Sequence, residues 1–211
     1  MSNRKARIKE QNRTDILDAA ERIFARMGFH LATVELIAQE AEFAVGTLYN
    51  FFKNKQELYE EVMERVGDRF LDRIEKDVIP HDDVYDASAA LIDLILEQFN
   101  THQGLLRDYV SIVPMTQLDP YCGLSDRCQE FYDKIIQYFV KIIEKGIKDE
   151  VFAKGDPTTL AVAFDGMCNS LIFYWARQES PPSLESQRET LICLSSRLLR
   201  AKPRNAQSTQ D

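Results

Sequence analysis

The sequence has 211 residues, of which 45% are hydrophobic and 28% are charged, and its formal net charge at pH 7 is −8. This composition is typical of a globular protein with one or two domains, and it excludes disordered and fibrous chains. With only 8 Gly and 7 Pro, a turn-rich all-β fold is excluded as well, and the sequence predicts an all-α protein. No segment approaches the roughly 18 uncharged apolar residues of a membrane span, so we expect a cytoplasmic protein.

Four helices are predicted in the N-terminal third, where apolar side chains recur every three to four positions. The first covers residues 14–28, where a glycine ends it. A short second helix is capped by Thr33, and a third covers Ala44 to Phe51. Asn54 is the expected N-cap of a long fourth helix that begins near Lys55.

Five further helices are predicted beyond Pro80 from the same periodicity. Asp156 and Ser183 are the expected N-caps of the last two. Glycine and proline predict a loop at residues 115–123, and residues 202–211 are expected to be a disordered tail. The chain should therefore contain about nine helices and no strand, the five later ones at about 82–103, 105–113, 125–149, 157–178 and 184–198.

Charge is unevenly distributed along the chain. Residues 1–55 carry nine basic and seven acidic side chains, a balance of +2, which leaves −10 for residues 56–211. Because the acidic remainder repels polyanions, any polyanionic partner is expected to bind the N-terminal segment. The first residues of that segment form a basic arm, with Arg4, Lys5, Arg7 and Lys9.

The cysteines and histidines give no clear metal-binding pattern. None of the four cysteines forms a CxxC pair, and the three histidines lie far from them in sequence. We expect buried structural thiols. A zinc site made from Cys122, Cys128 and a distant histidine stays open as an alternative, although the spacing does not favour it.

Three helices in the first 52 residues, the last two short and joined by a tight turn, have the dimensions of a helix-turn-helix unit. Short helical hairpins also occur in structural bundles, so spacing alone leaves both interpretations open. Residues 37–58, IAQEAEFAVGTLYNFFKNKQEL, follow the segment ILDAA at residues 16–20, Phe24 and Gly28 at matching distances. This pattern resembles the signature of the tetracycline-repressor (TetR) family of transcriptional regulators, over about residues 12–60.

The resemblance implies a third helix that enters the major groove of DNA. Since Gly46 has no side chain, the helix backbone can approach a base edge or a sugar closely. Hydroxyl groups and the Lys55 ammonium suit phosphate oxygens, whereas Val45 and Gly46 are expected to face bases. Asn50 can reach either a base edge or a phosphate. The basic arm, residues 1–12, either attracts the DNA backbone or minor groove, or is a solvated, frayed terminus. The expected DNA-binding residues are Thr33, Val45, Gly46, Thr47, Tyr49, Asn50 and Lys55.

Two positions depart from the family pattern in the turn between the second and third helices. The family usually has glycine where this chain has Glu42, and often a capping serine where it has Ala44. A glutamate in a left-handed turn costs on the order of 1 kcal/mol, and a missing cap costs a similar amount. Glu42 also adds a negative charge near the expected DNA surface.

For the rest of the chain the resemblance implies a ligand-binding and dimerisation domain at residues 55–201, after a DNA-binding domain at residues 1–54. In the family the last two helices form a two-fold dimer, here the helices predicted near 157–178 and 184–198. Residues 160–175 independently favour this arrangement, because they are apolar on almost every side and need cover all round. Alternatively, the core of a monomer buries this helix.

An effector pocket is expected among aromatic and sulfur-containing side chains, which suit apolar or aromatic ligands. Core packing is the alternative role for each of them. Asp165 and Asn169 lie one turn apart in an otherwise apolar helix, and a buried carboxylate needs a partner. That partner is a cationic or hydrogen-bonding ligand, Arg107, or a group across a dimer. The other pocket candidates are Phe99, Tyr109, Met115, Tyr121, Phe131, Tyr138 and Phe173.

The sequence thus predicts a homodimeric, ligand-responsive DNA-binding regulator, a repressor that a small molecule releases from a palindromic operator. The sequence does not distinguish an activator from a repressor, because the effect on transcription depends on where the operator lies relative to a promoter. The alternative is an interaction module of the same fold that has lost operator binding. We expect no cofactor and no enzyme, because no nucleophile–base pair, metal-ligand spacing or glycine-rich phosphate loop is present.

Overall fold

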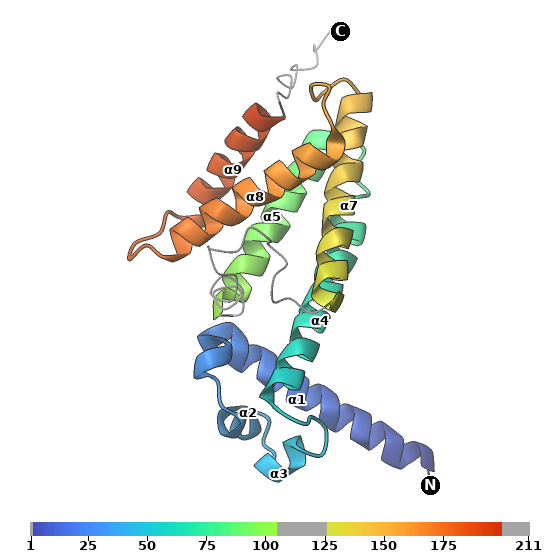
Figure 1. The fold of residues 1–211 in the computed structure, drawn as a ribbon, viewed down its shortest axis with the longest axis vertical. Coiled ribbons are helices and arrows are strands. Elements are labelled where there is room, and N and C mark those ends of the chain that lie inside the picture. Colours follow the sequence, from blue (N-terminus) through green and yellow to red (C-terminus); the bar gives the residue numbers. More distant parts are fainter. Residues whose placement is uncertain (1, 105–125, 200–211) are drawn as a thin grey trace, which may run out of the picture. The chain divides into compact units, whose positions relative to one another are not determined.

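The structure is a computed structural model that describes residues 2–104 and 126–199 (Figure 1). Every regular element in these two ranges is helical, which confirms the all-α prediction. Eight α-helices lie in the described ranges, close to the nine predicted, and the helix expected at 105–113 lies outside them. The chain divides into two compact units, Met1–Phe70 with Gln98–Gln129 and Leu71–Glu97 with Glu130–Asp211.

The first unit contains α1 (Ser2–Leu31), α2 (Val34–Glu40), α3 (Val45–Leu48) and most of α4 (Lys55–Arg73). The apolar stripes predicted from periodicity meet in one core, and burial of each large aliphatic or aromatic side chain contributes about 1.5–3 kcal/mol. The most deeply buried members of this core are Ile16, Ile23, Phe24, Ile37, Leu48, Leu58 and Val62.

Three details of this unit differ from the sequence-based prediction. Helix α1 begins at Ser2 instead of residue 14, so the basic arm is helical. Gly28 breaks the regular geometry as predicted, with φ 80°, but a helical turn continues to Leu31. Helix α3 covers only four residues because the chain tightens after Leu48, where Asn50 N–H donates to the Thr47 carbonyl at 3.1 Å.

The second unit contains the short π-helical segment η1 (Ile74–Val78), most of α5 (Val84–Thr101), α7 (Asp126–Lys148), α8 (Pro157–Ala176) and α9 (Leu184–Leu198). The predicted caps are confirmed, because Asp156 accepts from Thr159 N–H at 2.7 Å and Ser183 accepts from Ser186 N–H at 3.2 Å. No helix among the described residues is both long and apolar enough to cross a membrane.

The inward face of α9 carries Gln187, Leu191 and Ser195, whereas Leu184 at the start of the helix is 53% exposed. Cys193 is exposed, whereas Cys168 is buried as expected for a structural thiol. Burial raises the pKa of the Cys168 thiol to about 12.

Candidate functional site

The turn between α2 and α3 adopts the left-handed geometry that the family's glycine implies. Glu42 has φ 60°, and its N–H donates to the Gln39 carbonyl at 3.2 Å. The next N–H, of Phe43, donates to the Ala38 carbonyl at 2.9 Å. Ala44 is the N-cap of α3 and offers no side-chain hydrogen bond. The turn therefore forms even though Glu42 is strained in a left-handed conformation and Ala44 provides no side-chain cap.

Helix α3 presents a small, open surface to solvent. A Cβ atom added to Gly46 would meet no atom within 4 Å. Tyr49 is 53% exposed and Asn50 is exposed, whereas Leu48 is buried in the core of the first unit. Val45 and Thr47 are half-buried at the edge of this surface. Of the residues expected to face DNA, Gly46, Tyr49 and Asn50 are thus exposed together, with the helix backbone accessible at Gly46.

Thr33 lies at the other short helix of the motif and is the N-cap of α2, as predicted. Its hydroxyl oxygen accepts from Leu36 N–H at 3.2 Å. The pKa of Glu35 is lowered by hydrogen bonds from its own amide and from Thr33. A phosphate that binds here must therefore displace the Glu35 carboxylate from these donors.

Lys55 has partners that sequence reasoning did not identify. Its ammonium donates to the carbonyls of Phe29 at 2.8 Å and Ala32 at 2.9 Å, and lies 4.3 Å from the centre of the Phe29 ring. Lys55 thus ties the start of α4 to the end of α1. No local signal could reveal this link, because its partners are backbone atoms more than twenty residues away.

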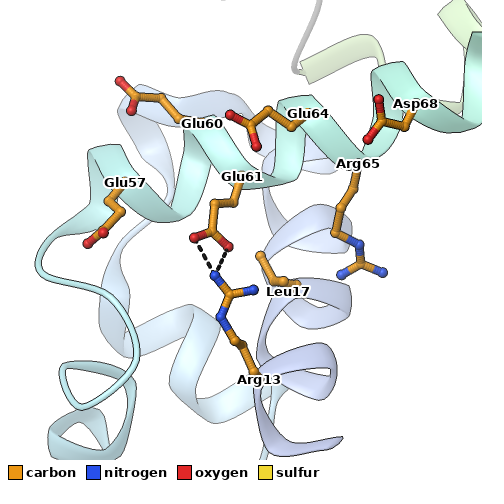
Figure 2. A pocket seen from close by; sticks show the side chains of 8 residues that line it. All are labelled: Arg13, Leu17, Glu57, Glu60, Glu61, Glu64, Arg65 and Asp68. Carbon is orange, nitrogen blue, oxygen red and sulfur yellow. Dashed lines mark hydrogen bonds and ion pairs between the residues drawn. The ribbon is translucent and has the colours of Figure 1, made fainter. Parts of the chain in front are cut away.

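A row of carboxylates lies along one face of α4. Figure 2 shows these side chains along the helix above Arg13, which forms an ion pair with Glu61. They line a pocket of about 460 Å³ between α1 and α4. A polyanion is repelled by such a face. The acidic row comprises Glu57, Glu60, Glu61, Glu64 and Asp68.

In the second unit the structure joins Asp165 and Asn169 as the sequence suggests. One Asp165 carboxylate oxygen accepts from Asn169 Nδ2 at 3.0 Å and from the Tyr132 hydroxyl at 2.8 Å. Asp165 is 8% exposed. Burial raises the pKa of Asp165, and the two hydrogen bonds offset part of that rise. Tyr132 was not predicted, because its role depends on how α7 packs against α8.

The remaining pocket candidates are dispersed. Phe99 is buried in the first unit, and Phe131 and Phe173 are half-buried in the second. The Tyr138 hydroxyl donates to the Glu75 carboxylate, which places it in a polar surface contact. Three others, Tyr109, Met115 and Tyr121, lie outside the described residues, as does Arg107.

The described residues cover helix α8 on one side only. A continuous face of it is exposed, with Val162 at 48% and Tyr174 at 62%. Between them a Cβ atom added to Gly166 would meet no atom within 4 Å. The predicted all-round cover is therefore not supplied by the described residues of this chain. The exposed face comprises Thr159, Val162, Ala163, Gly166, Ser170 and Tyr174.

Comparisons with known proteins agree with this geometry. Residues 16–62 match the family model of bacterial regulatory proteins, tetR family. The helix-turn-helix transcriptional regulator YhgD of Bacillus subtilis is 29% identical over 175 residues, which cover 81% of this chain and 87% of that protein. The transcriptional repressor KstR2 of Rhodococcus jostii is 26% identical, covering 74% of this chain and 75% of that protein.

The fold of the whole chain is also shared with solved regulators. A transcriptional regulator of Saccharomonospora viridis, solved in complex with choline, superposes with a TM-score of 0.72 at 22% identity, over 86% of this chain and 94% of that one. The proteins matched in sequence are transcriptional regulators and not enzymes. The helix-turn-helix at residues 16–62 thus matches that of tetR-family regulators, and the chain shares the fold of solved transcriptional regulators.

Proposed function

We propose that this chain is a TetR-family transcriptional regulator that binds a palindromic operator through α3, as a homodimer, and that a small molecule releases it. The observation that carries the proposal is the exposed α3 face, where Gly46 is open and Tyr49 and Asn50 project into solvent. An α-helix with an accessible backbone and hydrogen-bonding side chains fits the major groove. Acting on genomic DNA, the protein would work in the cytoplasm.

The proposed contacts divide into two classes. Tyr49, Thr47 and Lys55 would bind phosphates and fix the register, whereas Val45, Gly46 and Asn50 would face the bases. Repression is the expected outcome, since KstR2 is a repressor. The alternative is a module that has lost operator binding, and the Glu42 carboxylate, exposed beside α3, is the feature that favours it.

The proposed effector site is centred on Asp165. A buried carboxylate with hydrogen bonds from Tyr132 and Asn169 suits a cationic or hydrogen-bonding group on an otherwise apolar ligand. The S. viridis relative of similar fold was solved with choline, a small organic cation, which supports a cationic effector. Dimerisation is proposed through the exposed face of α8 together with α9, where Leu184 is also exposed.

The test is retention of sheared genomic DNA from the source organism at two salt concentrations, followed by sequencing of the retained fragments. We expect a shared palindrome upstream of a few genes. Tyr49→Phe should weaken binding to every fragment alike, whereas Tyr138→Phe, which removes a tyrosine hydroxyl of α7 in the second unit, should not. Retention of all fragments equally, and only at low salt, would favour the interaction module instead.

A further inference from the structure

Glu42 is strained in the turn between α2 and α3, yet its side chain forms no interaction that would compensate the strain. Its φ of 60° lies in the left-handed region, which is unfavourable for a residue with a Cβ atom. Its carboxylate is exposed and has no hydrogen bond or ion pair with any described residue. It therefore does not replace the side-chain cap that Ala44 lacks at the start of α3. Strained residues of this kind cluster at functional sites, which directs attention to a partner outside the chain.

The neighbouring carboxylates of the helix-turn-helix all have partners within the chain. Glu35 and Glu57 each accept a hydrogen bond from a backbone N–H. Glu40 forms an ion pair with an arginine of α1 at 2.7 Å. Among the acidic residues of the described segment 33–58, Glu42 is thus the one whose carboxylate is left for another molecule.

The backbone of Glu42 is fixed from both sides. Its own N–H donates to the Gln39 carbonyl at 3.2 Å, and the next N–H donates to the Ala38 carbonyl at 2.9 Å. The residues on either side, Ala41 and Phe43, pack against the core of the first unit. The start of the side chain is therefore held in one place beside α3, which lowers the entropy lost when the carboxylate binds a partner.

DNA offers a carboxylate few favourable contacts. Phosphates repel it, and in the major groove guanine presents the acceptors N7 and O6, while thymine presents the acceptor O4 and a methyl group. Adenine presents an amino group beside the acceptor N7. Cytosine presents its N4 amino group with no acceptor next to it on the same base. A carboxylate beside a recognition helix therefore favours cytosine over the other three bases.

We propose that Glu42 is a specificity-determining residue that accepts a hydrogen bond from the N4 amino group of one cytosine in each operator half-site. This inference rests on the proposed function. Glu42 lies three residues before Val45, the first residue of α3, and the N-terminal end of a recognition helix is the part that contacts base edges.

The carboxylate acts mainly by discriminating between sequences. Its repulsion by phosphates weakens binding to every sequence, and only the contact with cytosine offsets that repulsion. Glu42 thus lowers overall affinity while it increases the difference between the operator and other DNA. If Glu42 only repelled DNA, as in the interaction module, binding to all sequences would be weakened alike.

The test is a selection from a library of DNA duplexes with a randomised central segment, carried out with the wild type, Glu42→Gln and Glu42→Gly. Sequencing of the retained duplexes gives the base preference at each position. We expect the wild type to select a palindrome with a cytosine at one position of each half-site. Glu42→Gln should shift the preference there toward adenine, because a side-chain amide pairs with adenine N6 and N7. Glu42→Gly should select the same palindrome without a preference at that position.

Fluorescence anisotropy on the selected palindrome measures the size of the effect. Replacing the preferred cytosine in both half-sites should raise the Kd of the wild type at least about fivefold. For Glu42→Gly the ratio of the two constants should fall close to one. Glu60→Gln, which removes an exposed carboxylate from α4, is the matched control and should keep the wild-type ratio.

The outcomes separate this inference from the proposed function. If all three proteins select the same palindrome with the same preference at every position, Glu42 reads no base, and the inference is overturned while the proposed function stands. The inference is also overturned if both variants bind all sequences more tightly by the same factor. If the wild type selects no palindrome, the proposed function itself fails, and recognition of cytosine by Glu42 fails with it.

Discussion

At the scale of single residues, Glu42 combines a conformational and an electrostatic penalty. Its φ of 60° is unfavourable for any residue with a Cβ atom. We expect Glu42→Gly to raise the free energy of unfolding by about 1 kcal/mol, because glycine adopts this geometry without steric strain. Urea denaturation followed by circular dichroism measures the change. The same variant should bind DNA more tightly, since a negative charge is removed beside α3.

Glu42→Gln is the control that separates the two penalties. It retains a side chain at a left-handed position and removes only the charge. Binding to DNA should therefore improve as in Glu42→Gly, while the unfolding free energy stays near the wild-type value. Equal stabilisation by both variants would show that charge, and not backbone strain, is the source of the cost.

Local chemistry predicts some functional residues and fails for others. The left-handed turn and the buried polar pair of Asp165 and Asn169 follow from residue type and spacing. The partners of Asp165 and Lys55 do not, because they lie 33 residues away for Tyr132 and 26 for Phe29. Contacts at such separations depend on how helices pack, and a single sequence carries no direct record of packing.

At the scale of elements, the helix starts marked by a capping residue were predicted correctly, whereas the start of α1 at Ser2 was not. Thr33, Asn54, Asp156 and Ser183 each accept a hydrogen bond from an N–H three residues later, as their residue types indicate. The end of α3 was predicted too late, because tight turns after Leu48 preserve the inward spacing of Leu48 and Phe52 without an α-helix. Apolar periodicity does not distinguish these two geometries.

The N-terminal turns of α1 have features that suit a phosphate-binding arm. Their basic side chains are exposed, and no acidic residue lies in the first turn. Cations at a helix N-terminus interact unfavourably with the helix dipole, so these basic residues do not stabilise α1. Figure 1 shows these turns projecting beyond the other helices of the first unit. DNA phosphates would compensate the unfavourable charge.

We expect replacement of the four basic residues of the arm by glutamine to weaken DNA binding and reduce its salt dependence. The logarithmic salt slope should fall by about one unit for each phosphate that the arm no longer neutralises. Stability should change little, because the side chains are exposed. Fluorescence anisotropy across a salt series measures the slope, and Lys134→Gln with Lys154→Gln, exposed on the second unit, is the matched control. An unchanged slope would mean that the arm is only a solvated extension of α1.

At the scale of the whole molecule, the exposed face of α8 is the strongest indication of a dimer. In a monomer the apolar surfaces of Val162 and Tyr174 remain in contact with water, which is unfavourable. The small residues between them would allow a second helix to approach closely. Two-fold symmetry would also place two α3 helices on a palindrome. Periodicity predicted that α8 needs cover on every side, but could not decide whether the same chain or a second copy supplies it.

Gly166→Leu tests the dimer without harming the protomer. Its Cβ would meet no atom within 4 Å, and leucine has a higher helix propensity than glycine by roughly 0.8 kcal/mol. The free protomer should therefore be at least as stable. In a dimer the added side chain enters a close helix contact, where overpacking costs about 1–3 kcal/mol. Sedimentation velocity should show the dissociation constant of the dimer rising by about tenfold or more.

The matched control is Gln137→Leu, which adds a leucine to an exposed position of α7. It should leave the dimer intact, which excludes a general effect of surface hydrophobicity. Operator affinity should fall with dimerisation in Gly166→Leu alone, because one protomer reads only one half-site. If Gly166→Leu remained fully dimeric at the lowest measurable concentration, α8 would not be the interface, and its exposed apolar face would have to meet a different partner.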